Sequence, residues 1–171
     1  MKTVYLFRHA KSSWKEAGLT DKERPLNKRG WAAALAMGRH LAARYDGHLH
    51  VLCSTAVRAR QTLDRFLEGF GGDCAIHFES RLYMAGAHDI IGQIQKVNAA
   101  ADRLMVIGHN PGMHAAARAL AATGEPEDLH RLSARFPTAA LAEIAFEADD
   151  WGDIDVGQGI LMSYFKPREI A

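Results

Sequence analysis

Short apolar runs recur along the chain, with longer and less regular segments between them. The runs contain many β-branched and aromatic side chains, which favours buried strands. Strands are predicted at residues 3–7, 50–53, 75–78, 104–107, 139–146 and 160–165. The last two are separated by an acidic stretch. These two strands are expected to form one end of a sheet, and they could run antiparallel.

Between these runs, apolar residues recur every three or four positions, as on one face of an amphipathic helix. Helices are predicted at residues 31–45, from 54 or 55 to about 67, at 89–97 and at 111–122. Ser54 or Thr55 is the expected N-cap of the second helix, because either hydroxyl can accept a bond from the first turn. Pro111 is expected in the first turn of the last helix, where its missing N–H breaks no helical bond.

Strands that alternate with helices predict an α/β layered fold around a mostly parallel sheet. The sequence contains no internal repeat, low-complexity tract or linker, so residues 1–171 are predicted to form a single domain. A long polar loop is expected after the first strand, up to Gly30. Loops of this length in compact domains are usually functional.

The charge balance argues against some classes of partner. The 21 basic side chains nearly cancel the 20 acidic ones, so neither nucleic acid nor an anionic membrane is expected as the main partner. The chain has no run of 18 apolar residues, and its first apolar run is too short for a signal peptide. We therefore expect a cytoplasmic protein that does not span a membrane.

The spacing of cysteine and histidine does not indicate a metal site. Cys53 and Cys74 form no CxxC pair and are expected to be small core residues. The nine histidines contain no HExxH pattern, and His48 and His50, which flank a predicted strand, are interpreted as surface residues. No metal and no other cofactor is expected.

Chemically active side chains follow three of the predicted strands. Arg8 and His9 come directly after the first strand. Arg58 lies one helical turn beyond the second, and His109 comes just after the strand at residues 104–107. Ligands of open α/β sheets bind at the carboxyl ends of the strands. Two arginines and two histidines are therefore expected to meet in one cleft.

This set of side chains suits phosphoryl transfer. Arginine presents a planar fork of donors that matches phosphate oxygens and keeps its charge. A neutral imidazole can attack phosphorus and form a phosphohistidine, which divides one displacement into two. A second, protonated imidazole can donate to a phosphoryl oxygen. Each residue alone has an ordinary structural interpretation, but their joint position at strand ends predicts a phosphate site.

Three short segments carry a more specific pattern: Arg8-His9-Ala10, residues 54–62 (STAVRARQT) and Gly108-His109-Asn110. In this order they resemble the RHG, S-x-x-x-R-A-x-x-T and G-H-x segments of the histidine phosphatase, or phosphoglycerate mutase-like, superfamily. Residues 24–30 (RPLNKRG) also resemble the stretch before that family's first helix. The resemblance implies a three-layer αβα sandwich and a phosphatase.

Carried over by position, the resemblance makes His9 the nucleophile. The rest of the phosphate pocket would be Arg8, Arg58 and His109. Ser12 matches a frequent hydroxyl position, where it would either contact phosphate or cap the loop. Ala10 replaces the usual glycine, and a positive φ at this position would strain an alanine.

The substrate within the family depends on the leaving group. An alkoxide leaves poorly, so members that release one use a carboxylic acid as proton donor. The segment that usually supplies this acid is short here. Glu79 is a possible acid or a surface partner of Arg81, and Asp89 is a further candidate. A compact chain without an assured acid resembles the phosphohistidine phosphatase branch, so protein phosphohistidine is the expected substrate.

Two alternatives remain open on the sequence. One is a small-molecule phosphomonoesterase of the same superfamily. The other is an adaptor that binds phosphorylated partners without turnover, since a fold alone does not imply activity. The complete set of two histidines and two arginines favours an enzyme, because a binding module needs no nucleophilic imidazole. Trp14, in the loop after His9, is expected either to pack or to line the mouth of the cleft.

Overall fold

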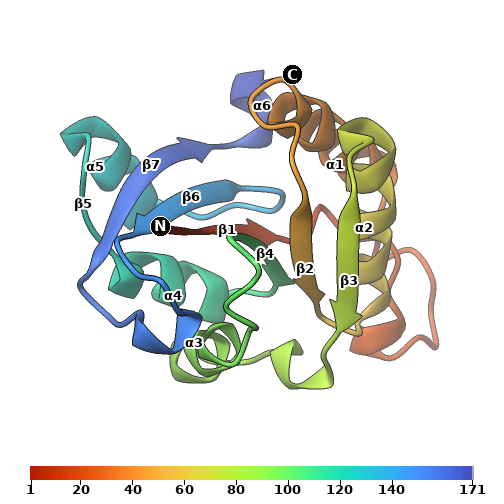
Figure 1. The fold of residues 1–171 in the computed structure, drawn as a ribbon. Coiled ribbons are helices and arrows are strands. Elements are labelled where there is room, and N and C mark those ends of the chain that lie inside the picture. Colours follow the sequence, from red (N-terminus) through yellow and green to blue (C-terminus); the bar gives the residue numbers. More distant parts are fainter. Residues whose placement is uncertain (171) are drawn as a thin grey trace.

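A seven-stranded mixed sheet forms the centre of the structure, a computed structural model that describes residues 1–170 (Figure 1). The strands are β1 Lys2–Arg8, β2 Leu49–Cys53, β3 Cys74–Phe78, β4 Arg103–Gly108, β5 Ala121–Gly124, β6 Leu141–Phe146 and β7 Gly159–Phe165. Their order across the sheet is β3-β2-β4-β1-β6-β7-β5. Only β6 runs against its neighbours, and the remaining pairings are parallel. The predicted mostly parallel sheet is therefore confirmed.

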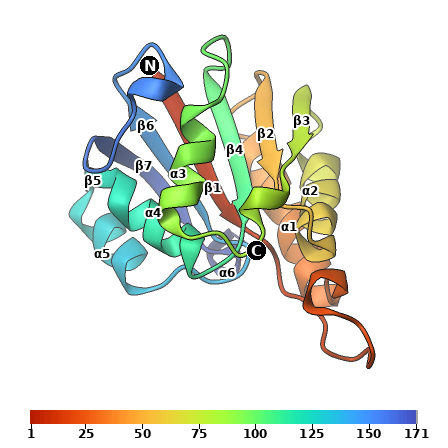
Figure 2. The ribbon, with the colours of Figure 1, turned by 90° about the horizontal axis from the view of Figure 1, so that it is seen from below.

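Helices cover both faces of this sheet (Figure 2). They are α1 Lys28–Ala42, α2 Val57–Phe70, α3 Ala87–Gln95, α4 Gly112–Leu120, α5 Pro126–Ala134 and α6 Pro167–Ile170, with short 3-10 helices η1 Asp21–Glu23, η2 Ser80–Leu82 and η3 Trp151–Asp153. α1 and α2 pack on one face, and α3 and α4 on the other. The three-layer arrangement is therefore confirmed. Within residues 1–170, no helix is both long and apolar enough to cross a bilayer.

Side chains of β1 point alternately to the two faces of the sheet and so contribute to two separate hydrophobic cores. Val4 and Leu6 point into the core beneath α3 and α4, whereas Tyr5 and Phe7 point into the core beneath α1 and α2. All four side chains are buried. A strand buried on both faces appears as a continuous apolar run, which is why β1 could be predicted as a central strand.

Two glycines let α1 and α2 approach each other closely. A Cβ atom at Gly38 would lie 2.1 Å from the carbonyl oxygen of Phe66, and one at Gly69 would lie 2.4 Å from that of Leu35. Both distances are far below van der Waals contact, so neither position has room for a side chain. This contact matters for the site, because α2 carries Arg58 in its first turn.

The boundaries of several elements differ from the predictions. α1 begins at Lys28, because the side chain of Asn27 accepts a bond from Gly30 N–H and caps the helix. The predicted N-cap of α2 was wrong: Ala56 takes that position, without a side-chain cap. Pro111 is the N-cap of α4 and lies outside the first turn.

One strand and one helix were not predicted. The predicted helix at 111–122 ends at Leu120, and the chain continues directly as β5 and then α5. β5 is short and lies at the edge of the sheet beside β7. Its residues, Ala-Ala-Thr-Gly, carry no strong strand pattern, so the pairing with β7 decides their conformation.

Candidate active site

The carboxyl ends of β1, β4 and β2 lie side by side and bring the predicted residues together. His9 N–H donates to the carbonyl of Gly108 at 3.0 Å, and Ser54 N–H donates to that of Ile107 at 3.0 Å. These bonds extend the parallel ladders one residue beyond the strands. As a result, the imidazole rings of His9 and His109 lie with their centroids 5.1 Å apart.

A cavity of about 230 Å³ opens at this edge of the sheet. Five of the predicted site residues line it: Arg8, His9, Ser12, Arg58 and His109. The remaining lining residues are Lys11, Trp14, Arg24, Met84, Asn110 and Thr138. Four of these side chains are positively charged, Arg8, Lys11, Arg24 and Arg58, and no carboxylate appears among the lining residues. The cavity is thus suited to an anion.

One hydrogen bond fixes the tautomer of His9. Its Nδ1 lies 2.7 Å from the carbonyl oxygen of Ala10, and a carbonyl can only accept, so Nδ1 carries the hydrogen. Nε2 therefore keeps its lone pair, 3.4 Å from the donating Nε of Arg58. Burial is the main cause that lowers the pKa of His9 to about 3, and nearby His109 and Arg58 act in the same direction. The imidazole is neutral at neutral pH, and its Nε2 is unprotonated.

The last threonine of the second motif ties the His9 loop to α2. Ala10 N–H donates to Thr62 Oγ1 at 2.9 Å, and that hydroxyl donates to the carbonyl of Arg58 at 2.7 Å. Among residues 1–170, the non-glycine residues with positive φ are Met84 and Ala139. Ala10 is not one of them, so alanine replaces the family's usual glycine here without backbone strain.

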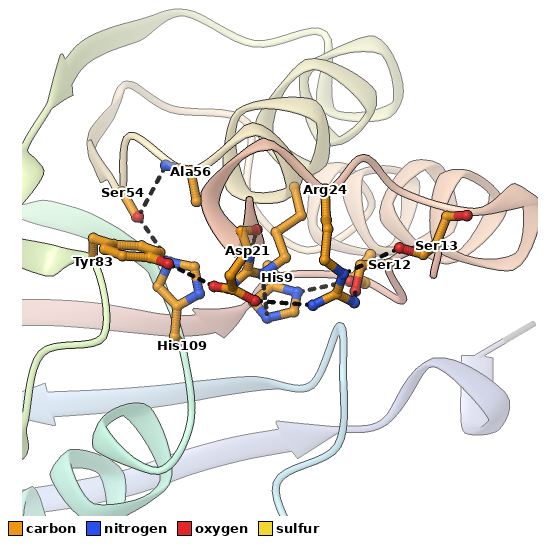
Figure 3. Close-up of polar contacts among 11 residues, drawn as sticks. His9, Ser12, Ser13, Asp21, Arg24, Ser54, Ala56, Tyr83 and His109 are labelled. Carbon is orange, nitrogen blue, oxygen red and sulfur yellow. Dashed lines mark hydrogen bonds and ion pairs between the residues drawn. The ribbon is translucent and has the colours of Figure 1, made fainter. Parts of the chain in front are cut away.

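Ser54, which follows β2, holds the imidazole of His109 by a hydrogen bond (Figure 3). Ser54 Oγ lies 2.7 Å from His109 Nε2 and also accepts from Ala56 N–H at 3.3 Å. The hydroxyl can donate its hydrogen to Nε2, and in the tautomer that accepts this bond the hydrogen of the imidazole is on Nδ1. His109 Nδ1 is buried without a hydrogen-bond partner among the described residues. Ser54, predicted as a helix cap, instead orients this imidazole.

The protonated second imidazole predicted from the sequence does not match this structure. Burial first, and then the charge of Arg58, lower the pKa of His109 to about 4, although Asp21 acts in the opposite direction. His109 is therefore neutral at neutral pH. In the tautomer that accepts from Ser54, it still has an N–H at Nδ1 and needs no second proton to donate.

A carboxylate that the sequence did not single out holds Arg58 in place. Arg58 Nη2 donates to Asp21 Oδ2 at 2.9 Å, and Nη1 donates to the Asp21 carbonyl at 2.6 Å. Tyr83 and Arg24 donate to the same carboxylate, at 2.5 and 3.0 Å (Figure 3). The bond from Tyr83, followed by the contacts with Arg58, holds the pKa of Asp21 at about 2. Asp21 lies in the loop predicted to be functional, but nothing in its spacing revealed the contact with α2.

Arg8 enters the cavity from the end of β1. Its Nη1 donates to the carbonyl of Phe136 at 3.2 Å, and Asn110 Nδ2 donates to the same oxygen at 2.8 Å. Arg8 Nε is buried and has no partner among the described residues. Buried donors are normally satisfied in folded proteins. Arg8 Nε is thus an unsatisfied donor, and His109 Nδ1 is likewise a buried polar atom without a partner, on residues that line the cavity.

The loop after His9 forms the mouth of the cavity. Ser12 Oγ accepts from Arg24 Nη2 at 2.5 Å, so this hydroxyl is engaged within the loop. The Arg24 guanidinium carbon lies 3.2 Å from the centre of the Trp14 ring. Trp14 is 77% exposed and lines the cavity, which places it at the mouth and not in the core. Met84, 53% exposed and with φ 53°, also lines the mouth.

The structure does not bring the candidate acids to the cavity. Glu79 Oε2 accepts from Arg81 N–H at 3.0 Å and caps η2, and its side chain lines a different depression together with His50 and His77. Asp89 is exposed in the first turn of α3. Neither residue lines the cavity around His9. In the described part of the chain, no three His, Cys, Asp or Glu side chains are grouped as a metal site.

A neutral histidine surrounded by arginines, at the strand ends of a three-layer α/β sheet, is an arrangement suited to phosphoryl transfer. A family model for the histidine phosphatase superfamily (branch 1) matches residues 4–83. An uncharacterised protein of Mycobacterium tuberculosis is 36% identical over 163 residues, which cover 94% of this chain and 99% of that protein. The chain belongs to the histidine phosphatase superfamily and is a phosphatase.

Solved structures agree with this assignment and with the predicted phosphoglycerate mutase-like fold. A candidate phosphohistidine phosphatase SixA from Agrobacterium tumefaciens is 30% identical, with a TM-score of 0.78, covering 97% of this chain and 98% of that one. A corresponding SixA protein from Nakamurella multipartitia is 26% identical, with a TM-score of 0.83, covering 97% and 96%.

Proposed function

We propose that this phosphatase removes the phosphoryl group from phosphohistidine in a protein substrate, with His9 as the nucleophile. The observation that carries the proposal is the fixed tautomer of His9, with its lone pair on Nε2 beside Arg58. A neutral imidazole that is already oriented needs no base to remove a proton before it attacks.

In the first step, His9 Nε2 forms a bond to phosphorus and the bond to the leaving nitrogen breaks. Arg8, Arg58 and His109 Nδ1 donate to the phosphoryl oxygens as charge accumulates on them. The departing imidazole takes its proton from solvent. In the second step, water attacks phosphorus, inorganic phosphate leaves, and His9 returns to its neutral form.

The lining of the cavity supports phosphohistidine over an alkyl phosphate. No carboxylate lines it in the described chain, and Asp21, which contacts Arg58, is ionised and occupied by Arg58, Arg24 and Tyr83. A phosphoramidate releases an imidazole, a much weaker base than an alkoxide, so it depends less on a positioned acid. The similarity to the two SixA proteins supports the same substrate class.

A small aryl phosphate is the second candidate substrate, because its leaving group also departs without an acid. A non-catalytic adaptor is disfavoured, since binding alone would not require an oriented, unprotonated nitrogen on His9. A cytoplasmic location stays a prediction of the sequence.

Trapping of the intermediate tests the proposal. Brief incubation of the wild type with a labelled phosphohistidine protein should leave acid-labile, alkali-stable label on the enzyme, and His9→Ala should retain its fold but carry no label. A matched variant, His88→Ala, changes an exposed histidine outside the cavity and should label normally. Acid-stable label, or equal labelling of His9→Ala, would contradict the mechanism.

A further inference from the structure

A second, larger cavity of about 420 Å³ adjoins the phosphate cavity. Lys11 and Thr138 line both cavities, so the two share a wall. The second cavity is therefore within reach of residues that flank a phosphohistidine bound at His9. Its lining combines basic and apolar side chains.

The first kind is basic. Five cations from four segments of the chain line the second cavity: Lys11, Arg29, Arg135, Lys166 and Arg168. None of them forms an ion pair with another residue in 1–170. No acidic residue lines the cavity, and the carboxylate of nearby Glu169 is bound to Arg131. The whole chain carries a net charge of only +1, so this concentration of positive charge is local.

The second kind is apolar. Ala32, Ala33 and Ala36 present small side chains from α1, and Pro137 and Pro167 add two rings. A single phosphate would need a cluster of converging donors and would gain nothing from this apolar wall. A cavity with apolar walls and several separate cations instead fits a peptide segment that carries both carboxylate and apolar side chains.

We propose that the second cavity binds acidic and apolar side chains that flank the phosphohistidine of a protein substrate. This inference rests on the proposed function, because it concerns the same substrate. Trp14 and Met84, both exposed at the mouth of the phosphate cavity, add large apolar contacts of the kind common in protein interfaces. Specificity for the substrate would thus lie outside the phosphate cavity, in the residues around the phosphorylated histidine.

Two phosphohistidine peptides of equal length test the proposal, one with Asp, Glu and Leu flanks and one with Ser and Ala flanks. The variant Arg29→Glu/Arg135→Glu reverses two of the cations and leaves the residues around His9 unchanged. The control variant, Arg39→Glu/Arg118→Glu, reverses two exposed cations outside both cavities. Turnover of an aryl phosphate by each protein verifies that the catalytic residues remain intact.

For the wild type, kcat/KM should be higher for the acidic peptide, and this preference should weaken as salt is added. In Arg29→Glu/Arg135→Glu, KM for the acidic peptide should rise roughly tenfold, while kcat and aryl phosphate turnover stay unchanged. The control variant should behave as the wild type. The absence of a preference in the wild type, or an equal loss for both peptides, would overturn the proposal.

Failure of the proposed function has a different signature. The wild type would then hydrolyse aryl phosphate but neither phosphopeptide. In that case, binding of the unphosphorylated acidic peptide is measured by calorimetry. Binding that is lost in Arg29→Glu/Arg135→Glu supports the proposed role of the second cavity. The absence of binding overturns it. Binding of inorganic pyrophosphate that the same variant removes, without any effect of the peptides, would also overturn it and assign the cavity to a second phosphate.

Discussion

At the scale of single residues, the site depends on which atom of each side chain is already engaged. The carbonyl of Ala10 accepts a hydrogen bond from Nδ1 of His9, and the hydroxyl of Ser54 is hydrogen-bonded to Nε2 of His109. In the proposed mechanism, each imidazole thereby keeps one nitrogen for a phosphoryl group. These constraints are set by neighbours that do not themselves line the cavity.

Two arginines on α2 provide a matched pair. Arg58 is 4% exposed and lines the cavity, whereas Arg60 is exposed with its guanidinium carbon 4.2 Å from the centre of the Phe78 ring. We expect Arg58→Ala to lower kcat/KM by about 10²–10³-fold, the loss typical of one donor to a developing anion. Arg60→Ala should change it less than about threefold, as expected for an exposed cation. Equal losses in steady-state assays would contradict the orientation of α2 in this structure.

Asp21 gives a second prediction at this scale. Asp21→Asn keeps the shape of the side chain but removes a negative charge that faces Arg58 and Arg24. Inorganic phosphate should then inhibit several-fold more strongly, because the cavity becomes more positive, while kcat should fall about tenfold because Arg58 is held less firmly. Asp89→Asn, which changes an exposed carboxylate outside the cavity, is the control. Weaker inhibition with an unchanged kcat would show that Asp21 has no role in positioning Arg58.

At the scale of elements, the site requires α1 and α2 to lie unusually close. The loop that carries Asp21 runs into α1, and Arg58 comes from the first turn of α2. Their contact therefore depends on how these two helices pack. Gly38 and Gly69, one on each helix, remove the side chains that would hold the helices apart.

A pair of glycine substitutions tests this packing. Both Gly38 and Gly92 are helical, and alanine normally favours a helix by up to about 1 kcal/mol over glycine. Gly92 in α3 has nothing within 4 Å of an added Cβ, so Gly92→Ala should keep or slightly raise the melting temperature. Gly38→Ala places its Cβ 2.1 Å from the Phe66 carbonyl oxygen and should instead destabilise the protein by about 1–3 kcal/mol. Thermal unfolding of both variants measures the difference, and equal melting temperatures would contradict the close contact.

At the scale of the whole molecule, burial of the two site histidines links catalysis to stability. His9 and His109 are 6% and 2% exposed, and their pKa values lie at about 3 and about 4 instead of 6.5. A depressed histidine pKa means that the unfolded chain binds protons at a pH where the folded chain does not. Both imidazoles are therefore kept neutral, as the proposed mechanism requires, at the expense of stability in acid.

The consequence is a defined pH window. Stability from these groups is fully present above about pH 6.5 and should fall as the pH drops from 6.5 toward 4, by about 1.4 kcal/mol per pH unit for each histidine. The variant His9→Gln/His109→Gln should show a shallower decline of the free energy of unfolding over this range. His88→Gln, at an exposed position, should follow the wild type. Parallel denaturant titrations at several pH values measure this, and equal slopes in all three proteins would contradict it.

The sequence by itself determined the layered α/β fold and the main site residues. Apolar runs that are buried on both faces predicted the central strands, and parallel strands bring their carboxyl ends to one edge. Arg8, His9, Arg58 and His109 could be found because each follows a strand end, either directly or within a helical turn. The edge strand β5 could not be predicted, because its residues are extended only through pairing with β7.

Only the tertiary structure decided which groups support that site. Asp21 meets Arg58 across 37 residues of sequence, and Ser54 meets His109 across 55, at distances set by helix packing and strand register. Glu79 follows a strand as His9 does, but β3 lies at the edge of the sheet, and its end lines another depression. Local patterns encode which residues follow a strand. The order of strands across the sheet decides which of those ends meet.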